Sequence, residues 1–534
     1  MKTGIKQPHD NASKIRESLE SIAVSPEVFD EKCQPVIDYI EELEGKIRLL
    51  QKQVFASKTE KRSAPENDGQ MLLFNEAETE SAEIKAEESK EESIEVPAHT
   101  RVKPKRKPLP ESLERVEVVH DIDESEKICG CGACLERIGE ETSEKLDIIP
   151  AKIRVIRHIR PKYACRKCEG TESEDQTVKI APVPAQIIPK GIPTEGLLAW
   201  IVVSKFCDSL PLYRQVKLFE RIGVTLSIST MASWMIQVAE KCQPLIELLR
   251  KEILSGPCIN IDETTLQVLK EPDRADQTKS YMWIFRGGDP EMPSLIYQYS
   301  PTRAGSVAKN FVEGYSGYCQ TDGYAGYDCL EKEQGIKLLG CFSHVRRKFI
   351  DIIDARGKKE KGKTGSPEQA LAYIQKLYII ERKAVNENLS PDEIRSLRQR
   401  ESKPVLDEFK KWMDKKVTHT PPSHLLGKAL NYTLSNWDRL TRYIEDGNLK
   451  PDNNAAENAI RPFVVGRKNW LFSGHPNGAH ASSILYSLVE SAKAAKLEPY
   501  SYIRLIFEKI PLAENEDDYK KLLPRYIAAQ KILE

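Results

Sequence analysis

The chain is 534 residues long, with 40% hydrophobic residues, 30% charged residues and a formal net charge of −1. This length exceeds what one hydrophobic core supports, so about three or four domains are expected. No apolar run approaches the roughly 18 residues of a membrane span, and MKTGIKQPHD at the N-terminus contains no apolar signal region. We therefore expect a cytoplasmic protein without a membrane partner.

The near-zero net charge conceals an uneven distribution. Residues 75–97 hold nine Glu and two Lys, so the remainder of the chain carries +6. Basic clusters occur in RVKPKRK (101–107), HVRRKF (344–349) and RPFVVGRK (461–468). Such clusters are typical of nucleic-acid binders, although most charge runs are simply solvated faces. The composition therefore does not exclude a nucleic-acid partner.

Residues 1–57 are expected to form an N-terminal helical, coiled-coil region. Between residues 36 and 54, apolar side chains recur at a/d spacing, at Val36, Ile40, Leu43, Ile47, Leu50 and Val54. This seam is short and Gly45 weakens it, so a dimerising coiled coil and a helix docked on its own chain both fit. Residues 58–118 have the composition of a disordered linker, first acidic and then basic.

Five of the twelve cysteines cluster in a predicted zinc module, residues 119–175. They are Cys129, Cys131, Cys134, Cys165 and Cys168. Two C-x₂-C knuckles about 30 residues apart suit one structural Zn²⁺ held by four thiolates. The second knuckle is Cys165 with Cys168, while Cys129/Cys131 and Cys131/Cys134 are both open for the first.

Residues 184–250 are predicted to be helical, with the outline of a helix-turn-helix. A helix at about 212–222 meets a Gly-Val turn, and Ser227 or Ser229 can cap the next helix. Many helical hairpins share this outline, so it does not decide whether the segment reads DNA.

From residue 256 the pattern changes to strands, in CINIDETTLQVL, SYMWIFRG, SLIYQYS, GYCQTDGYAGYD and KLLGCFSHV. Residues 351–446 are helical again, and Ser390-Pro-Asp-Glu393 is a capping box with proline at the first helical position. Residues 481–534 predict two or three amphipathic helices. The fold class expected is multidomain α+β.

Three carboxylates, one of them from an adjacent acidic pair, are candidates for one metal site. The pair Asp262-Glu263 ends a strand, Asp322 follows another strand just before Gly323, and Glu457 begins a helix. Hard oxygen ligands from such positions can hold two Mg²⁺ (or Mn²⁺) ions for phosphoryl transfer. The alternative is turn-forming aspartates and an ion-paired glutamate.

The start of that last helix is predicted from NNAAENAIRPF (453–463). Asn453 or Asn454 can cap it, which places Glu457 in or near the first turn, where a carboxylate is favoured. Arg461 follows four residues later as a helical ion-pair partner.

Several motifs together resemble one known family. They are FNEAE (74–78), SEKLDIIPAKIRVIRHIRPKYACRKCE (143–169), PLYRQ (211–215), IDET (261–264), TDGYAGYD (321–328), GCFSHVRRKF (340–349) and NNAAENAIRPFVVGRKNWLFSG (453–474). In this order they resemble the large transposase of the IS66 family of bacterial insertion sequences, from about residue 36 to about residue 510.

The resemblance implies a ribonuclease-H-like catalytic core of residues 256–350 and 447–480, with the helical insertion between them. It implies an acidic triad of Asp262, Asp322 and Glu457, and selects Asp262 over Glu263. Six basic residues are expected to contact DNA: Arg346, Arg347, Lys348, Arg461, Arg467 and Lys468.

For the cysteines, the resemblance aligns the family's knuckle with Cys131-Gly132. The zinc ligands it implies are therefore Cys129, Cys131, Cys165 and Cys168, with Cys134 as an alternative ligand. Cys341-x₂-His344 resembles a motif that follows the second aspartate in related transposase groups. Its role stays open between a second zinc site, packing and DNA contact.

The activity implied is that of a DDE-type transposase, which cuts and joins DNA at the terminal inverted repeats of its element and at target DNA. A homodimer or larger assembly and small accessory proteins of the same element are expected, in the bacterial cytoplasm at the nucleoid. The alternatives are a ribonuclease-H-fold nuclease that cannot join strands and a zinc-containing DNA-binding regulator without catalysis.

The zinc module yields the first testable prediction. Cys165→Ser should release zinc and destabilise residues 119–175, because metal-binding energy is folding energy in such modules. Elemental analysis and limited proteolysis would measure both effects. Intact wild-type protein without zinc would contradict the prediction.

Overall fold

The computed structural model describes residues 153–164, 178–355 and 365–533, together with Ile40, Leu43, Gly45 and Ile47, which are helical. The chain divides into two compact units, residues 1–73 with 184–534 and residues 74–183. In the second unit, β1 (Lys162–Ala164) pairs antiparallel with β2 (Val178–Ile180). The other residues of 36–54 and the linker 58–118 lie outside the described residues, so the coiled coil stays a prediction.

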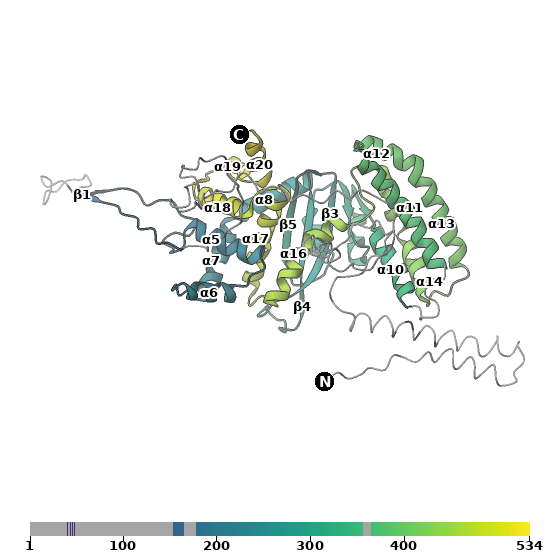
Figure 1. The fold of residues 1–534 in the computed structure, drawn as a ribbon, viewed down its shortest axis with the longest axis horizontal. Coiled ribbons are helices and arrows are strands. Elements are labelled where there is room, and N and C mark those ends of the chain that lie inside the picture. The colour runs from purple at the N-terminus through teal and green to yellow at the C-terminus, as the bar shows by residue number, and fades with distance from the viewer. Residues whose placement is uncertain are drawn as a thin grey trace, which may run out of the picture. The chain divides into compact units, whose positions relative to one another are not determined.

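The first unit is built on one mixed sheet with a majority of helices around it (Figure 1). Its strands are β3 (Cys258–Gln267), β4 (Lys279–Gly288), β5 (Pro293–Ser300), β6 (Gly317–Gln320) and β7 (Ile336–Leu339). The spatial order is β5-β4-β3-β6-β7, with antiparallel pairing from β5 to β3 and parallel pairing from β3 to β7. The five strand runs predicted from sequence are confirmed.

Helices cover the sheet. Four consecutive residues of β4, Met282 to Phe285, are fully buried, which requires packing on both faces of the strand. Helix α8 (Gln243–Ser255) packs on β4 and β5, whereas α16 (Asn454–Trp470) packs on β3 and β4. Because the candidate carboxylate Glu457 lies in the first turn of α16, the core packing of this helix fixes where that side chain lies.

Helix α17 (Pro476–Ala494) packs against the edge strand β5. The Ser487 hydroxyl accepts the backbone N–H of Tyr297 at 2.8 Å, and the Ser491 hydroxyl accepts that of Leu295 at 3.0 Å. An edge strand otherwise exposes unpaired backbone groups, so these serines satisfy part of the edge and leave less of it open to another chain.

The C-terminal region differs from the prediction of two or three amphipathic helices. It contains α17, α18 (Pro499–Lys509), η7 (Ile510–Leu512), α19 (Glu516–Lys521) and α20 (Pro524–Leu533). Residues 485–492 of α17 are all buried, so that helix is enclosed on every side rather than amphipathic. The sequence pattern failed here because small serines and alanines, not a polar face, allow its close packing.

The predicted helix at about 212–222 and the helix that follows its Gly-Val turn are confirmed. After α5 (Glu195–Phe206), α6 (Leu212–Arg221) and α7 (Ile228–Lys241) are joined at Gly223, whose φ is +83°. Ser227 rather than Ser229 is the cap, because its hydroxyl accepts the backbone N–H of Thr230 at 3.0 Å. Helix α7 packs against α17 and α5 against α18.

The insertion has its own helical core, separate from the sheet core (Figure 1). Helix α10 (Phe342–Ala355) leads into it, and its helices are α11 (Ser366–Asn386), α12 (Pro391–Leu397), the π-helical turn η5 (Arg398–Ser402), α13 (Lys403–Val417), α14 (Leu425–Ser435), α15 (Trp437–Thr441) and η6 (Arg442–Glu445). Shorter elements before it are α9 (Ser306–Phe311) and η3 (Ala325–Lys332). The Ser390 capping box is confirmed, since Glu393 accepts the Ser390 backbone N–H at 2.8 Å.

Arg398 joins the insertion to the segment that leads into α16. Its side chain is 1% exposed and donates to both carboxylate oxygens of Glu381, at 2.8 and 2.6 Å. It also donates to the backbone carbonyls of Tyr443, Asp446 and Leu449. One buried guanidinium thus fixes the path of the chain just before the candidate site.

Arg398→Ala should therefore lower the free energy of unfolding by about 3–5 kcal/mol, because it leaves the Glu381 carboxylate unpaired in the interior. Chemical denaturation of the full chain would measure this loss. The control is Arg400→Ala, which removes an exposed arginine from the same turn. Equal midpoints for the two variants would contradict the prediction.

Candidate functional site

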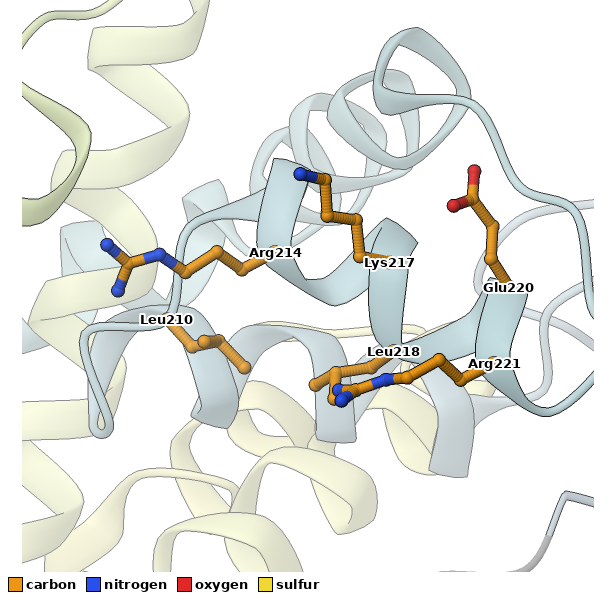
Figure 2. Close-up of a pocket in the computed structure, with 6 residues that line it drawn as sticks. All are labelled: Leu210, Arg214, Lys217, Leu218, Glu220 and Arg221. Atoms are coloured by element: carbon orange, nitrogen blue, oxygen red, sulfur yellow. The ribbon is translucent and has the colours of Figure 1, made fainter.

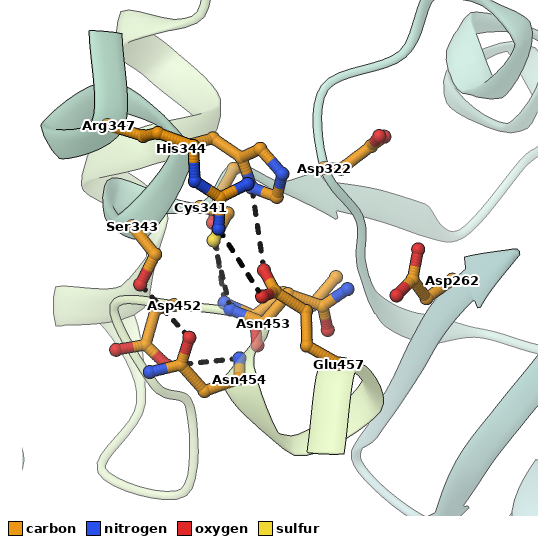
Figure 3. A network of polar contacts seen from close by, with 12 residues as sticks. Asp262, Asp322, Cys341, Ser343, His344, Arg347, Asp452, Asn453, Asn454 and Glu457 are labelled. Carbon is orange, nitrogen blue, oxygen red and sulfur yellow. Dashed lines mark hydrogen bonds and ion pairs between the residues drawn. The ribbon is translucent and has the colours of Figure 1, made fainter. Parts of the chain in front are cut away.

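Asp262 and Asp322 are brought together by the parallel pairing of β3 with β6. The register places Asn260 beside Gln320. Asp322 follows the end of β6 by two residues and Asp262 follows Asn260 on β3 by two, and the two carboxylates are close enough that Asp322 helps to raise the pKa of Asp262. The two aspartates lie near Glu457 of α16 (Figure 3). Three segments that are distant in sequence thus bring their carboxylates together. The prediction that Asp262 ends a strand is wrong, because β3 continues to Gln267 through its pairing with β4.

The chain turns sharply directly after Asp322. Gly323 has a φ of +80°, as expected from its place in the sequence, and a Cβ there would lie 2.8 Å from the Tyr432 hydroxyl. That hydroxyl donates to the backbone carbonyl of Asp322 at 2.9 Å. Because Tyr432 belongs to α14, the helical insertion helps to orient the second aspartate.

Glu457 lies in the first turn of α16, as predicted, but it faces another helix. Its Oε1 lies 3.7 Å from Nδ1 of His344, and its Oε2 lies 3.8 Å from the Arg347 guanidinium (Figure 3). Both partners belong to the first turns of α10. Burial lowers the pKa of His344, with the nearby Glu457 carboxylate acting in the opposite direction. The carboxylate is therefore held between the starts of two helices.

Asn453 occupies the predicted N-cap position of α16, but its side chain does not cap the helix. Its amide nitrogen donates to the backbone carbonyl of Ile261 at 2.8 Å, and its amide oxygen accepts from Asn260 at 3.1 Å. Its backbone N–H donates to Sγ of Cys341 at 3.2 Å. Asn453 thereby ties the start of α16 to β3, one residue before Asp262.

The same network reaches the second aspartate. Asn260 also donates to the Gln320 side-chain oxygen at 3.0 Å, and Gln320 donates to the backbone carbonyl of Lys450 at 2.8 Å. All three amide side chains, including that of Asn453, are buried. Buried amides with their partners in place specify one arrangement, because every alternative would leave polar groups unsatisfied.

Sequence reasoning missed this network. The available signal was Asn260, a polar residue inside the apolar run that precedes Asp262.

The electrostatics of the site centre on Asp262. Burial raises its pKa to about 8, and the neighbouring carboxylates of Glu263, Asp322 and Glu457 add to this shift. A hydrogen bond from the backbone N–H of Glu263 acts in the opposite direction. Carboxylates crowded in this way repel one another, and a divalent cation would neutralise that repulsion. Their hard oxygen atoms are ligands that suit Mg²⁺ or Mn²⁺.

Glu263 has a different environment from Asp262. Arg303 donates to its carboxylate at 2.6 Å, and the Tyr327 hydroxyl donates to its other oxygen. The same guanidinium lies 3.9 Å from Asp322 and 3.7 Å from the centre of the Tyr324 ring. Arg303 follows β5 and was not singled out from the sequence. With Glu263 already engaged, Asp262 is the more accessible ligand of the pair.

The six predicted DNA contacts lie on the two helices that carry the site. They are Arg346, Arg347 and Lys348 on α10 and Arg461, Arg467 and Lys468 on α16. The ammonium of Lys348 lies 4.2 Å from the centre of the Tyr432 ring, and Arg467 donates to the hydroxyls of Thr264 and Thr265 on β3. Positive charge therefore flanks the carboxylates on both helices.

Cys341 and His344 are brought to the same site. Cys341 directly precedes α10, His344 lies in its first turn, and both approach Glu457 (Figure 3). Their ligand atoms and a Glu457 oxygen all lie within 4.8 Å of one another. The five candidate zinc ligands of the knuckles, Cys129, Cys131, Cys134, Cys165 and Cys168, lie outside the described residues.

A second basic feature lies on the helix pair. Figure 2 shows a shallow pocket around α6, lined by Leu210, Arg214, Lys217, Leu218, Glu220 and Arg221. Three cations against one carboxylate give this surface the charge that favours a phosphate backbone. No helix in the described part of the chain is both long and apolar enough to cross a membrane.

The amide network leads to a stability prediction. Asn453→Ala should lower the free energy of unfolding by about 2–3 kcal/mol, because it leaves the Ile261 carbonyl and an Asn260 N–H unpaired in the interior. Urea denaturation would measure the loss. Asn458→Ala, on the exposed face of the same helix, is the matched control and should change little. Indistinguishable variants would show that the network contributes nothing.

Comparison with known proteins agrees with these observations. The model described as "Transposase IS66 family" matches residues 190–481, and the "zinc-finger binding domain of transposase IS66" matches residues 126–169. "Transposase C of IS166 homeodomain" matches residues 42–118, and the "IS66 C-terminal element" matches residues 487–524.

Relatives of similar length come from Sinorhizobium fredii. The uncharacterized protein y4jD is 35% identical over 416 residues, which is 75% of this chain and 78% of the relative. The uncharacterized protein y4qI is 31% identical over 506 residues, 90% of this chain and 87% of the relative. With one family model covering more than half of the sequence and others matching at both ends, the chain belongs to the IS66 family of insertion-sequence transposases and carries its zinc-finger element.

Proposed function

We propose that this chain is a DDE-type transposase that catalyses metal-dependent strand cleavage and strand transfer at the ends of its insertion sequence. The observation that carries the proposal is the convergence of Asp262, Asp322 and Glu457 from β3, the turn after β6 and the first turn of α16. Burying several carboxylates close together costs free energy of folding. A cluster of this kind therefore indicates a functional site.

The sheet supports a ribonuclease-H-like core. Three antiparallel strands precede two strands that join the sheet in parallel, in the order β5-β4-β3-β6-β7. The carboxylates lie on the central strand and beside its parallel neighbour. Residues 256–350 and 447–480 would form this core, with residues 351–446 inserted between the second aspartate and the glutamate.

Asp262, Asp322 and Glu457 would hold two Mg²⁺ (or Mn²⁺) ions, which supply activation of the attacking oxygen and stabilisation of the leaving oxygen in an in-line displacement. The chain's own contribution is to fix the three carboxylates. The side-chain amide of Asn453 fixes the start of α16, which carries Glu457. The hydroxyl of Tyr432 fixes the turn after β6, which carries Asp322. Arg347 approaches Glu457 from the exposed side of α10 and is placed to meet a phosphate there.

DNA would be gripped by the basic residues of α10 and α16, through phosphates rather than bases. The zinc module, with Cys129, Cys131 (or Cys134), Cys165 and Cys168, and the helix pair α6–α7 would bind the terminal inverted repeats. Holding two DNA ends together calls for a homodimer or larger assembly, with accessory proteins of the same element as further partners at the nucleoid.

Activity is tested on a labelled duplex that carries the element's ends, with Mg²⁺ or Mn²⁺ and with accessory proteins added in a parallel reaction. Wild type should cleave and join strands. Asp262→Asn and Glu457→Gln should each lower the rate at least about 10³-fold while binding is retained, because each removes a charged metal ligand.

The control variant is Asp328→Asn, in which an exposed carboxylate of η3 is neutralised. Equal activity of Glu457→Gln and wild type would remove Glu457 from the triad. Cleavage without joining would identify a nuclease, and binding without either reaction would identify a DNA-binding regulator.

The raised pKa of Asp262 predicts how metal binding depends on pH. A carboxyl group must lose its proton before it binds Mg²⁺, so affinity should rise by up to about tenfold per pH unit towards pH 8 and then level off. Titration calorimetry of the full chain between about pH 6 and pH 9 measures this dependence. Asp262→Asn should bind more weakly with a flatter profile. A wild-type affinity that does not change with pH would contradict the prediction.

A further inference from the structure

A thiol and an imidazole lie beside the carboxylate cluster and approach one of its members, Glu457. Sγ of Cys341, Nδ1 of His344 and one oxygen of Glu457 lie within 4.8 Å of one another, the only such metal-ligand group found among the described residues. Cys341 and His344 are three residues apart at the start of α10, so helical geometry turns both towards the same space. Glu457 completes the group from the start of α16 (Figure 3).

Two of these ligand atoms are buried and lack hydrogen-bond partners. They are Nδ1 of His344 and Oε1 of Glu457. The two atoms face each other at 3.7 Å, which is too long for a hydrogen bond between them. Buried polar atoms without partners are rare in native proteins and call for an explanation, such as an ion that both atoms contact.

The third ligand atom is a buried sulfur with a hydrogen-bond donor beside it. Cys341 is 2% exposed, and its sulfur accepts the backbone N–H of Asn453 at 3.2 Å. Hydrogen bonds of this kind stabilise negative charge on a ligand sulfur and fix its direction. The other described cysteines, including Cys207 and Cys319, are free and belong to no such group.

We propose that Cys341, His344 and Glu457 form a second zinc site, which takes a thiophilic divalent cation of the Zn²⁺ class. A set of sulfur, nitrogen and oxygen ligands suits zinc, whereas Mg²⁺ requires oxygen ligands only. Bonds of about 2.0–2.1 Å at tetrahedral angles place a nitrogen and an oxygen ligand about 3.4 Å apart, so the observed pair needs only a small adjustment.

The bound cation links the start of α10 to the start of α16. It takes up Oε1 of Glu457 and thereby fixes the rotamer of a residue that the proposed function also uses. The zinc site does not depend on that function, because zinc content is measured without any DNA reaction. Three protein ligands leave a fourth position open, unlike the closed four-thiolate knuckle site.

The test is the zinc content of the full chain after equilibration with Zn²⁺ and removal of the excess, measured by elemental analysis. Wild type should contain two zinc ions, one in the knuckles and one here. Cys341→Ser and His344→Asn should each contain one. The matched control is Cys207→Ser, which removes a half-buried thiol at the end of α5 and should retain two.

A second background removes the knuckle site. Cys165 and Cys168 belong to the other compact unit, so Cys165→Ser/Cys168→Ser leaves the unit that holds Cys341 intact. This double variant should retain one zinc, and addition of Cys341→Ser should reduce it to none. In the double variant, Co²⁺ in place of zinc should show the absorption of a thiolate ligand, and Cys341→Ser should abolish it.

Two results would overturn the proposal: equal zinc content in wild type and Cys341→Ser, or a knuckle double variant without zinc and without the cobalt absorption. Strand cleavage separates this site from the proposed function. One zinc with active cleavage overturns the second site alone, whereas two zinc ions without cleavage support the site and count against the transposase reaction.

Discussion

The side-chain amide of Asn453 is the interaction on which the candidate site depends. It joins the start of α16 to β3, while Asn260 extends the same hydrogen bonds to Gln320 on β6. Carboxylates placed side by side repel one another, and burial adds to the cost of their charge, as the pKa of Asp262 shows. A satisfied amide network directly beneath them offsets that tendency to separate, because moving any one of the three elements would break buried hydrogen bonds.

The helical insertion contributes to the site as well as interrupting the core. Its helices α11 and α14 pack against α10, which brings His344 and Arg347 to Glu457, and α14 brings Tyr432 to the backbone of Asp322. Arg398 then fixes the returning chain immediately before α16. The insertion therefore orients both carboxylates between which it lies in the sequence, and its folding is coupled to the geometry of the site.

At the β5 edge of the sheet, α17 connects the strands to the helix pair. Ser487 and Ser491 bind the backbone of β5, and the same helix also packs against α7. The basic surface of α6 is thus attached to the sheet through two packed helices within one compact unit. A DNA segment held there would be positioned relative to the carboxylates by a continuous core and not by a linker.

Local signals in the sequence determined the five strands, the helix pair on either side of Gly223, the capping box at Ser390 and the turn at Gly323. Each rests on residues within a few positions of one another, where propensity and hydrogen bonding act directly. The motifs also determined the family, and through it the candidates Asp262 and Glu457.

Only the tertiary structure decided how these residues meet. Asn453 has the sequence position of a helix cap, yet its side chain bonds to β3, because its partners come from a strand nearly two hundred residues away. The approach of Cys341 and His344 to Glu457 and the burial of α17 on all sides likewise depend on contacts between distant segments. Local pattern carries no information about such contacts, since their energy arises only once the sheet has formed.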